Sequence, residues 1–164
     1  MIATIRKYQD QDWADTWKII EPVFRAGETY AFSPDITTEE AYMVWIEAPA
    51  ATFVAVDSNQ AIVGTYYIKP NQPALGAHVC NCGYIVAEHA RNQGLASRMC
   101  DHSQAQAVVM GFLAMQYNLV VSTNESAVRL WKKHGFEIIG TLPKSFLHNR
   151  LGLIDAHVMY KLLT

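Results

Sequence analysis

Residues 84–96 read Tyr-Ile-Val-Ala-Glu-His-Ala-Arg-Asn-Gln-Gly-Leu-Ala, and this stretch decides the fold that we expect. Its apolar beginning predicts a strand, and a helix is expected to start near Gly94. A helix that starts without a capping side chain leaves free backbone N–H groups, and its dipole favours negative charge there. We therefore expect an anionic ligand at this junction.

The residue types at the junction favour a pyrophosphate. Gly94 allows the backbone to approach the phosphates, and Ala96 keeps the first helical turn slim. Arg91 adds a fixed positive charge. A pattern as loose as Arg/Gln-x-x-Gly-x-Gly/Ala arises by chance in roughly one chain in ten of this length, given the ordinary frequency of glycine. A second motif is therefore needed.

Composition predicts one soluble globular domain spanning residues 1–164, with 51% hydrophobic and 17% charged residues. The 13 basic residues are balanced by 15 acidic ones and form no long run, which argues against a nucleic-acid surface or a membrane-surface helix. We expect a small-molecule partner, and a homodimer is one assembly that we consider.

The beginning of the chain has no apolar stretch of signal-peptide length, and no segment approaches the roughly 20 apolar residues of a membrane helix. We therefore expect a cytoplasmic protein. The three cysteines, Cys80, Cys82 and Cys100, form neither a disulfide framework nor a zinc pattern. Cys80 and Cys82 would share one face of a strand as small buried side chains. We expect no metal.

The first third of the chain predicts a strand at 3–7 and two helices. Trp13, Trp17, Ile20 and Phe24 have the spacing of one helical face, with Asp10 as the expected cap. Pro22 should kink or break this helix, and residues 26–34 should form a loop. A second helix is expected to begin near Thr37, with an apolar face.

The rest of the chain predicts a sheet with two further helices. Strands are expected at 52–56 and 62–69, paired antiparallel, and at 78–86. A helix at 94–110 should carry a buried stripe of Leu95, Met99, Ser103, Ala107 and Met110. The strand at 117–122 should then run parallel to the strand ending at Val86. A helix capped by Thr123 or Asn124 follows, and strands at 137–142 and 155–162 enclose a loop at 143–152.

The second motif is Asn124-Glu125-Ser126-Ala127-Val128-Arg129-Leu130-Trp131-Lys132-Lys133-His134-Gly135-Phe136. Together with the first motif, in this order and on these elements, it resembles the GCN5-related N-acetyltransferase family over nearly the whole chain. The resemblance implies a mixed α/β fold. Its central sheet of about seven strands is mostly antiparallel, with helices on both faces and one splayed parallel strand pair.

The resemblance also implies acetyl-CoA as the cosubstrate. The backbone of Tyr84, Ile85 and Val86 would hold the pantetheine arm, and Asn124 and Ala127 would form the far wall of its channel. The pyrophosphate would lie on Arg91, Asn92, Gln93, Gly94, Leu95 and Ala96. From the residues alone, Asn124 is equally a helix cap, Ala127 a core residue and Gly135-Phe136 a helix end with a packed aromatic ring.

Trp131 departs from the family pattern. Many members carry a tyrosine there, whose phenol is thought to protonate the departing thiolate. An indole N–H donates a hydrogen bond but does not titrate usefully. Either another group serves, with Tyr117 and Tyr84 as candidates, or the thiolate leaves without an acid, which we favour.

The stretches 78–84, 117–120 and 154–156 resemble the subgroup that contains the yeast acetyltransferase of azetidine-2-carboxylate. In that subgroup two asparagines act at the acceptor end, which by position are Asn81 and Asn118 here. An amide can hold a carboxylate or a reacting amine without ionising. The alternative is that such an asparagine stabilises a strand irregularity.

The implied chemistry is direct attack of an amine on the thioester, with the oxyanion held by a backbone N–H near Ile85 or Val86. Cys82 as an acyl carrier lacks a local activating base. The general base is open, and the candidates are Glu28, His78, Glu88 and water ordered by Asn81. Side chains of Thr29, Tyr30 and Phe32 are expected to line the acceptor pocket beside Glu28.

We therefore expect an acetyl-CoA-dependent N-acetyltransferase of a small amine, with an amino acid or analogue as one acceptor class. The alternatives are a non-catalytic acyl-CoA sensor, which Trp131 favours, and a protein N-terminal acetyltransferase. The aromatic loop argues against an open peptide groove. A dehydrogenase would need Gly-x-Gly-x-x-Gly and a nucleoside triphosphatase a Gly-Lys-Ser/Thr loop, and both are absent from the sequence.

Overall fold

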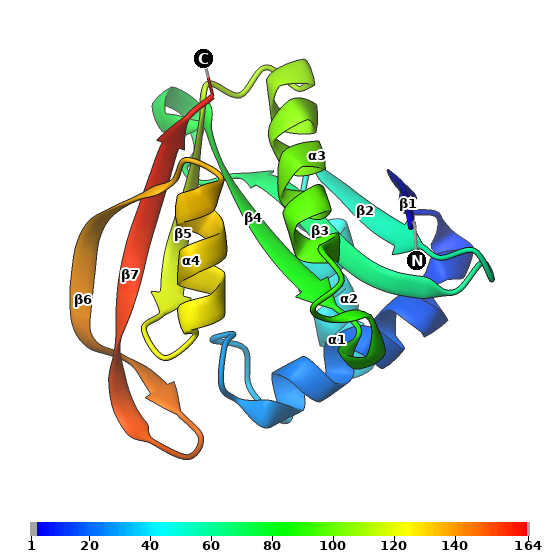
Figure 1. Ribbon diagram of the computed structural model, residues 1–164, viewed down its shortest axis with the longest axis horizontal. Helices are drawn as coiled ribbons and strands as arrows, with labels where there is room; N and C mark the ends of the chain where they lie inside the picture. Colours follow the sequence, from blue (N-terminus) through cyan, green and yellow to red (C-terminus); the bar gives the residue numbers. More distant parts are fainter. Residues whose placement is uncertain (1–2, 164) are drawn as a thin grey trace.

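The computed structural model describes residues 3–163 as one mixed sheet with helices on both faces (Figure 1). The seven strands follow the order β1-β2-β3-β4-β5-β7-β6, and of the strand pairs described only β4–β5 is parallel. This confirms the expected fold class. The strands are β1 (Thr4–Lys7), β2 (Ala51–Val56), β3 (Ile62–Pro70), β4 (Val79–Val86), β5 (Ala114–Val121), β6 (Glu137–His148) and β7 (Gly152–Leu162). The helices are α1 (Trp13–Ala26), α2 (Thr38–Tyr42), α3 (Leu95–Val109) and α4 (Glu125–Lys133), with short helical turns η1 (Asp10–Asp12), η2 (Met43–Glu47), η3 (Ala74–Gly76) and η4 (Glu88–Ala90).

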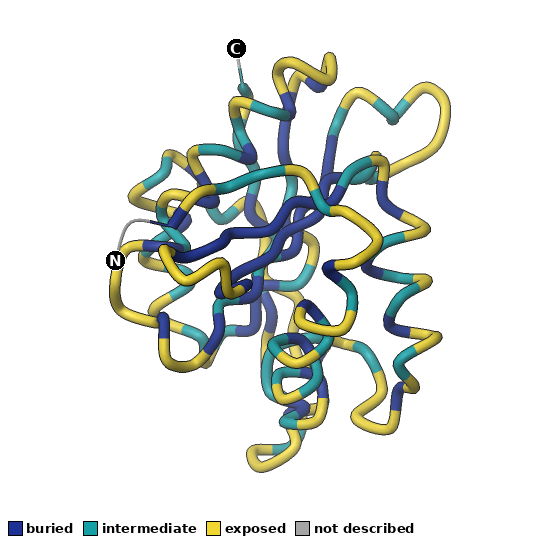
Figure 2. Tube along the Cα trace, turned by 90° about the vertical axis from the view of Figure 1, so that its right-hand side faces the viewer, coloured by how far each residue is buried: buried dark blue, intermediate teal, exposed yellow. Residues whose placement is uncertain are grey.

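The two larger apolar cores lie on opposite faces of the sheet. Helices α3 and α4 cover one face through a cluster that includes Met99 and Trp131, and α1, α2 and η2 cover the other through Phe24 and Trp45. The central strands between them are buried along most of their length (Figure 2). Burial of side chains on both faces explains why β3 and β4 read as nearly continuous apolar runs.

The first helix confirms the expected apolar face but corrects two expectations at its ends. Asp10 lies in the turn η1 and does not cap α1; instead the Asp12 carboxylate accepts the Gln9 N–H at 2.8 Å. Pro22 does not break the helix, which continues to Ala26. A proline removes one backbone hydrogen bond, and the full burial of neighbouring Ile20 holds the helix against the sheet.

Helix α3 buries the expected stripe except at its end. Leu95, Met99, Ser103 and Ala107 are buried, whereas Met110 is exposed. The helix ends at Val109, so the chain turns away before Met110 can continue the stripe. The cysteines at 80 and 82 are buried on β4 as expected.

Strands β4 and β5 pair only at their beginnings. The register is Val79 with Ala114 and Cys80 with Met115, after which the strands diverge. Strand β5 starts at Ala114, earlier than expected, and its other edge pairs with β7 from Ala114 to Val121. The parallel direction was predicted correctly, and the divergence opens a gap in the middle of the sheet.

The expected loop at 143–152 is wrong, because β6 and β7 extend into it as a hairpin that turns at 149–151. Pro143 belongs to β6, and the register shifts between Leu142 and Phe146. β6 is the last strand of the sheet. An edge strand with a bulge tolerates a residue that cannot donate a hydrogen bond.

Candidate active site

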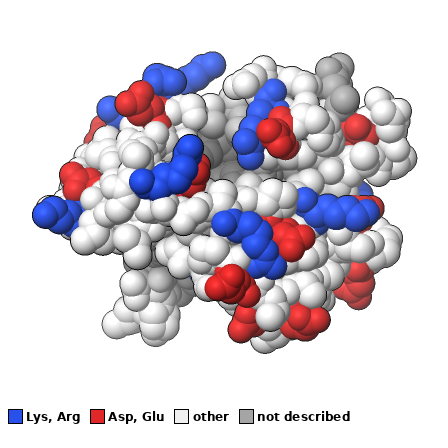
Figure 3. All heavy atoms as spheres, turned by 90° about the horizontal axis from the view of Figure 1, so that it is seen from below, with Lys and Arg blue, Asp and Glu red and all other residues white. Residues whose placement is uncertain are grey.

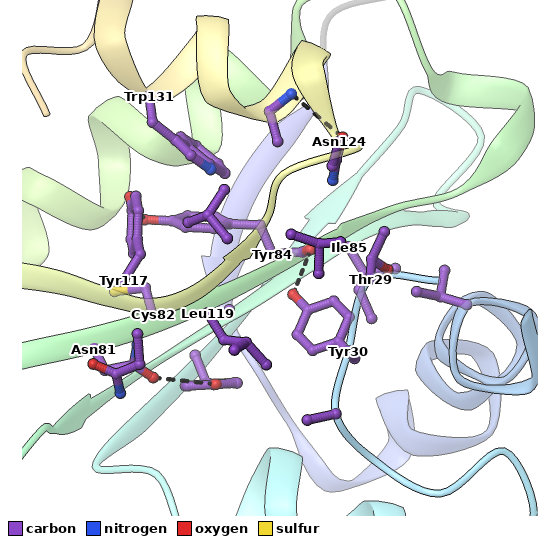
Figure 4. Close-up of a pocket in the computed structure, with 18 of the residues that line it drawn as sticks. Thr29, Tyr30, Asn81, Cys82, Tyr84, Ile85, Tyr117, Leu119, Asn124 and Trp131 are labelled. Atoms are coloured by element: carbon purple, nitrogen blue, oxygen red, sulfur yellow. Dashed lines mark hydrogen bonds between the residues drawn. The ribbon is translucent and has the colours of Figure 1, made fainter. Parts of the chain in front are cut away.

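A cavity of about 520 Å³ passes through the gap between β4 and β5 (Figure 4). It joins the two faces of the sheet, because its walls come from α4 on one face and from the loop after α1 on the other. We call that loop, residues 27–34, the aromatic loop. The lining residues are Val23, Thr29, Tyr30, Ala31, Phe32, Tyr67, Lys69, Asn81, Cys82, Gly83, Tyr84, Ile85, Val86, Arg91, Tyr117, Asn118, Leu119, Val120, Val121, Asn124, Ser126, Ala127 and Trp131.

The open edge of β4 presents backbone groups to this cavity. The Ala87 N–H donates to Val63 at 2.9 Å, and the Asn71 N–H donates to Val79 at 2.8 Å. Because hydrogen-bonding direction alternates along a strand, Ile85 also faces β3, whereas Tyr84 and Val86 face the gap. Of the two oxyanion donors expected from the sequence, the Ile85 N–H is therefore committed to β3, whereas the Val86 N–H faces the gap.

The junction before α3 has the geometry expected of an anion site. Helix α3 starts at Leu95, its N-cap residue Gly94 supplies no side-chain cap, and residues 91–94 are exposed. Asn92 and Gly94 have φ of 60° and 78°, which turns the chain into the helix. A Cβ on Gly94 would meet no atom within 4 Å, so space for a ligand adjoins the free N–H groups. In the same turn Gln93 is tied to its own loop, donating to the His89 carbonyl at 3.1 Å.

On the wall formed by α4, Asn124 both caps the helix and lines the cavity. Its Oδ1 accepts the Ala127 N–H at 3.4 Å, which caps α4, and the side chain also lines the cavity. Ala127 lines the cavity and packs against the larger core. At the other end of α4, Gly135 has φ of 89° and Phe136 stacks on Tyr117 at 4.4 Å, as expected for a helix end.

Trp131 closes the α4 side of the cavity with two tyrosines (Figure 4). Its ring lies 5.0 Å from that of Tyr84 and 4.9 Å from that of Tyr117. The Tyr84 hydroxyl is 2.9 Å from the Tyr117 hydroxyl and 2.6 Å from Ser103 Oγ. Burial raises the pKa of both phenols well above the usual value. Both hydroxyls are therefore neutral and engaged with each other.

The aromatic loop closes the opposite side. The Tyr30 hydroxyl donates to the Tyr84 carbonyl at 2.8 Å, which satisfies an acceptor on the open edge of β4 (Figure 4). Burial raises the pKa of Tyr30 well above its usual value, so this hydroxyl remains a donor. Thr29 and Phe32 line the same wall, as expected.

Asn81 bridges the strands where they diverge. Its Nδ2 donates to the Gln116 carbonyl of β5 at 3.0 Å, and its Oδ1 accepts from the Tyr67 hydroxyl at 3.3 Å. A Cβ on Gly83 would lie 2.6 Å from the Tyr67 ring, so the glycine lets this ring cross β4 to reach Asn81. Asn81 thus stabilises a strand irregularity and lines the cavity at the same position.

Asn118 lies at the exposed mouth of the cavity. Its Nδ2 donates to Asn71 Oδ1 at 2.6 Å, and its Oδ1 accepts from Gln116 Nε2 at 3.0 Å. The structure therefore brings Asn81 and Asn118 to one end of the cavity, while residues 91–94 and Asn124 lie toward the other.

The three side chains considered as general bases lie outside the cavity lining. Glu28 forms an ion pair with Arg150, with Oε1 2.7 Å from Nε. His78 is exposed before the start of β4, and Glu88 is exposed in η4. No Asp, Glu or His is among the residues that line the cavity. Cys82 lines it, but burial raises its thiol pKa well above the usual value, which disfavours a thiolate nucleophile.

Sequence reasoning missed Tyr67 and Lys69, which line the cavity from β3 at the end where Asn81 and Asn118 lie. The available signal was their alternation: Tyr67 and Lys69 point to the same face as Phe24 and Trp45, while Tyr66 and Ile68 enter the other core. It also missed Arg150, because the partner of Glu28 comes from a turn 122 positions later that only the folded hairpin brings close.

The comparisons with known proteins agree with this geometry. The model of the acetyltransferase (GNAT) family matches residues 13–136. The chain belongs to this family. A GCN5-related N-acetyltransferase from Kribbella flavida shares 37% identity and has a TM-score of 0.92, covering 98% of this chain and 97% of that one. A phosphinothricin acetyltransferase from Sinorhizobium meliloti in complex with AcCoA shares the fold of this GNAT chain at 17% identity and a TM-score of 0.87, covering 99% of this chain and 89% of that one.

A curated relative is N-acetyltransferase aca1 of Schizosaccharomyces pombe, 30% identical over 112 residues. The match covers 68% of this GNAT chain and 54% of the relative, so the chain spans about half the length of the curated protein it matches. In residues 3–163 no helix is long and apolar enough to cross a membrane, and no group of His, Cys, Asp and Glu side chains is placed to hold a metal ion. On the face drawn in Figure 3, basic and acidic side chains are interspersed.

Proposed function

We propose that this chain is an acetyl-CoA-dependent N-acetyltransferase that acetylates a small amine, with amino acids and their analogues as the acceptor class. The observation that carries the proposal is the cavity through the sheet, which has an uncapped helix N-terminus near one mouth and an aromatic loop at the other. Such a passage lets two substrates enter from opposite faces and meet in the middle. Membership of the GNAT family supports the same reaction.

The residues present fit the cosubstrate. The free N–H groups of Leu95 and Ala96, the open space at Gly94 and the exposed Arg91 would bind the pyrophosphate. The edge of β4 that faces the gap would hydrogen-bond the pantetheine amides in the manner of an added strand, with the Val86 backbone open and the Tyr84 carbonyl already accepting from the Tyr30 hydroxyl. Asn124, Ala127 and Trp131 would form the opposite wall of the channel.

The amine would reach the thioester from the aromatic-loop side. Its nitrogen forms a bond to the acetyl carbon, the C–S bond breaks, and the amine proton passes to water. The N–H groups that point into the gap, from Tyr84 and Val86, are the available donors for the oxyanion. Asn81 and Asn118 would orient the amine and the water that takes its proton, since the cavity lining holds no carboxylate or imidazole.

Departure of coenzyme A needs no protonating side chain in this proposal. Trp131 cannot supply a proton, and the neighbouring phenols of Tyr84 and Tyr117 have pKa values raised by burial. A phenol with a raised pKa is a weak acid and adds little to the departure of a thiolate, because alkyl thiols such as cysteine have a pKa of only about 8.5. Catalysis would come from positioning and from the backbone donors.

The test is release of free thiol from acetyl-CoA by the purified protein. The acceptor panel contains small amino acids and proline analogues, amine-bearing antibiotics, and short peptides with free N-termini. Turnover confined to the small amino acids and analogues is the expected result. Turnover on peptides alone would identify a protein N-terminal acetyltransferase and overturn the acceptor class.

The competing function is a non-catalytic acyl-CoA sensor, and Trp131 is the residue that favours it. Tight binding of acetyl-CoA in a calorimeter, with no thiol release on any acceptor, would support the sensor and overturn the transferase. In that case Trp131→Tyr becomes the informative variant, because it restores the phenol that many family members carry.

A further inference from the structure

Two cationic side chains line the cavity, and they occupy different ends. Arg91 lies beside the α3 N-terminus, whereas Lys69 comes from the end of β3 next to Asn81. No Asp or Glu lines the cavity. Arg91 has an evident use, because the cosubstrate carries a pyrophosphate. Lys69 has no corresponding partner in the proposed reaction.

The backbone fixes the place of Lys69. Lys69 and Asn81 are register partners in the antiparallel β3–β4 pair, so their side chains stand next to each other on the same face. Lys69 Nζ lies 5.2 Å from the centre of the Tyr67 ring, and the Tyr67 hydroxyl donates to Asn81. The ammonium group, the ring and the amide therefore form one cluster at the acceptor end.

The ammonium group has no ionic partner in the part of the chain that the structure describes. None of the ion pairs between residues 3 and 163 includes Lys69. The residue is half-buried, and a cation held in such a place attracts an anion more strongly than one in open water does. The contact with Tyr67 orients the charge but leaves it uncompensated.

We propose that Lys69 binds the carboxylate of the acceptor, and that the protein thereby selects α-amino and α-imino acids over neutral or polycationic amines. This inference rests on the proposed function. With the carboxylate on Lys69, the neighbouring Asn81 amide lies beside the α-carbon end of the acceptor, where the reacting nitrogen is. A cavity without acidic side chains would repel a polyamine or an aminoglycoside instead of holding it.

The experiment compares each acceptor with its neutral amide, for example proline with prolinamide and azetidine-2-carboxylate with its carboxamide. The variants are Lys69→Met, which keeps the length of the side chain, and Lys69→Arg, which keeps the charge. Lys132→Met, at an exposed site on α4 outside the cavity lining, is the matched control. For each protein we measure the ratio of kcat/KM for the acid to kcat/KM for its amide. The acid and the amide differ in basicity, but this difference is the same for every protein and cancels when the ratios are compared.

The expected result is a fall of this ratio by about 10- to 100-fold in Lys69→Met, the size of one charge-assisted hydrogen bond. KM for the acid should carry the change while kcat changes little. Lys69→Arg should retain most of the ratio, and Lys132→Met all of it. An unchanged ratio in Lys69→Met, with all proteins active, would overturn the inference and leave the proposed function standing.

Equilibrium binding separates a failure of the proposed function from a failure of the inference about Lys69. Titration of the same amino acids and amides into the protein, with coenzyme A present, needs no turnover. If thiol release fails for every acceptor but amino acids bind, and bind more weakly to Lys69→Met than to Lys132→Met, the proposed function falls and the role of Lys69 stands. If the acids bind no better than the amides to the unaltered protein, Lys69 does not read the carboxylate.

Discussion

Arg150 Nε lies 2.7 Å from Glu28 Oε1, and this ion pair ties the tip of the β6–β7 hairpin to the aromatic loop. The Asn149 N–H next to it donates to the Gly27 carbonyl at 2.9 Å. Two contacts from one turn thus hold the segment that carries Thr29 and Tyr30. The hairpin at the far edge of the sheet therefore braces one wall of the acceptor end.

Breaking this ion pair should weaken acceptor binding without unfolding the protein. We expect Glu28→Gln and Arg150→Met each to raise KM for the acceptor several-fold and to leave KM for acetyl-CoA unchanged. An exposed ion pair contributes about 1 kcal/mol or less to the free energy of unfolding, so stability should change little. Lys18→Met, which breaks the exposed pair with Asp15, is the control.

The same pair of variants separates a brace from a general base. If the ion pair only holds the aromatic loop in place, Glu28→Gln and Arg150→Met should have the same effect. A loss of kcat of about 100-fold or more in Glu28→Gln alone, with Arg150→Met unaffected, would identify Glu28 as the base and contradict our placement of it.

Gly94→Val should abolish acetyl-CoA binding and leave the fold largely intact. The backbone there has φ of 78°, where a β-branched residue is strained, and the added side chain would occupy the space beside the free N–H groups. Gly111→Val is the matched control, because Gly111 has φ of 90° with the same open surroundings at the other end of α3. Unchanged cofactor affinity in Gly94→Val would overturn the pyrophosphate assignment.

Tyr84→Phe and Tyr117→Phe should each lower the free energy of unfolding while changing kcat little. Each change removes a hydroxyl from the buried hydrogen-bonded pair, which costs about 1 kcal/mol of unfolding free energy. We expect kcat to stay within about fivefold, because a general acid would contribute at least about 100-fold. Denaturant unfolding and steady-state kinetics test both values, and a large fall of kcat in one variant would identify the missing acid.

The pH dependence of kcat/KM should follow the acceptor amine. Since the cavity lining has no Asp, Glu or His, the reactive neutral amine should be supplied by solution equilibrium. The logarithm of kcat/KM should then rise with a slope of about one up to the pKa of the acceptor. An inflection between pH 5 and 8 that stays in place when acceptors of different basicity are compared would show that a protein group acts as the base.

Acidification should destabilise the fold through His102. Burial lowers the pKa of this imidazole, and its Nδ1 lies 2.6 Å from the Tyr66 hydroxyl. The unfolded chain then binds a proton more readily than the folded one, so stability is full above the unfolded pKa near 6.5 and falls as pH drops through the folded value. The free energy of unfolding at pH 7 and pH 5.5 should differ more in the unaltered protein than in His102→Gln.

Much of the fold could be predicted because its signals are local. The apolar spacing of α1, the capping box at Thr37 and the glycine before Phe136 each act within a few residues. The uncapped start of α3 was likewise readable from residues 91–96. Of the two outcomes expected at Pro22, the break was wrong, because the core beneath α1 holds the helix in place.

The acceptor end could not be predicted in the same way, because its members meet only across the sheet. Lys69 and Asn81 are brought together by strand register, and Glu28 and Arg150 by the length of a hairpin. The sequence around each of these four residues does not indicate which distant residue it contacts. The loop expected at 143–152 failed for the same reason: pairing of β6 with β7 overrides the turn-forming residues.

The sequence by itself determined the family, the order of elements and the end of the cavity that suits a pyrophosphate, since backbone conformation and helix capping depend on neighbours along the chain. Only the tertiary structure decided where β4 and β5 part, which N–H groups face the gap, and which charges stand at the acceptor end. Those features depend on strand pairing and on burial between distant segments, which form only when the helices pack on the two faces of the sheet.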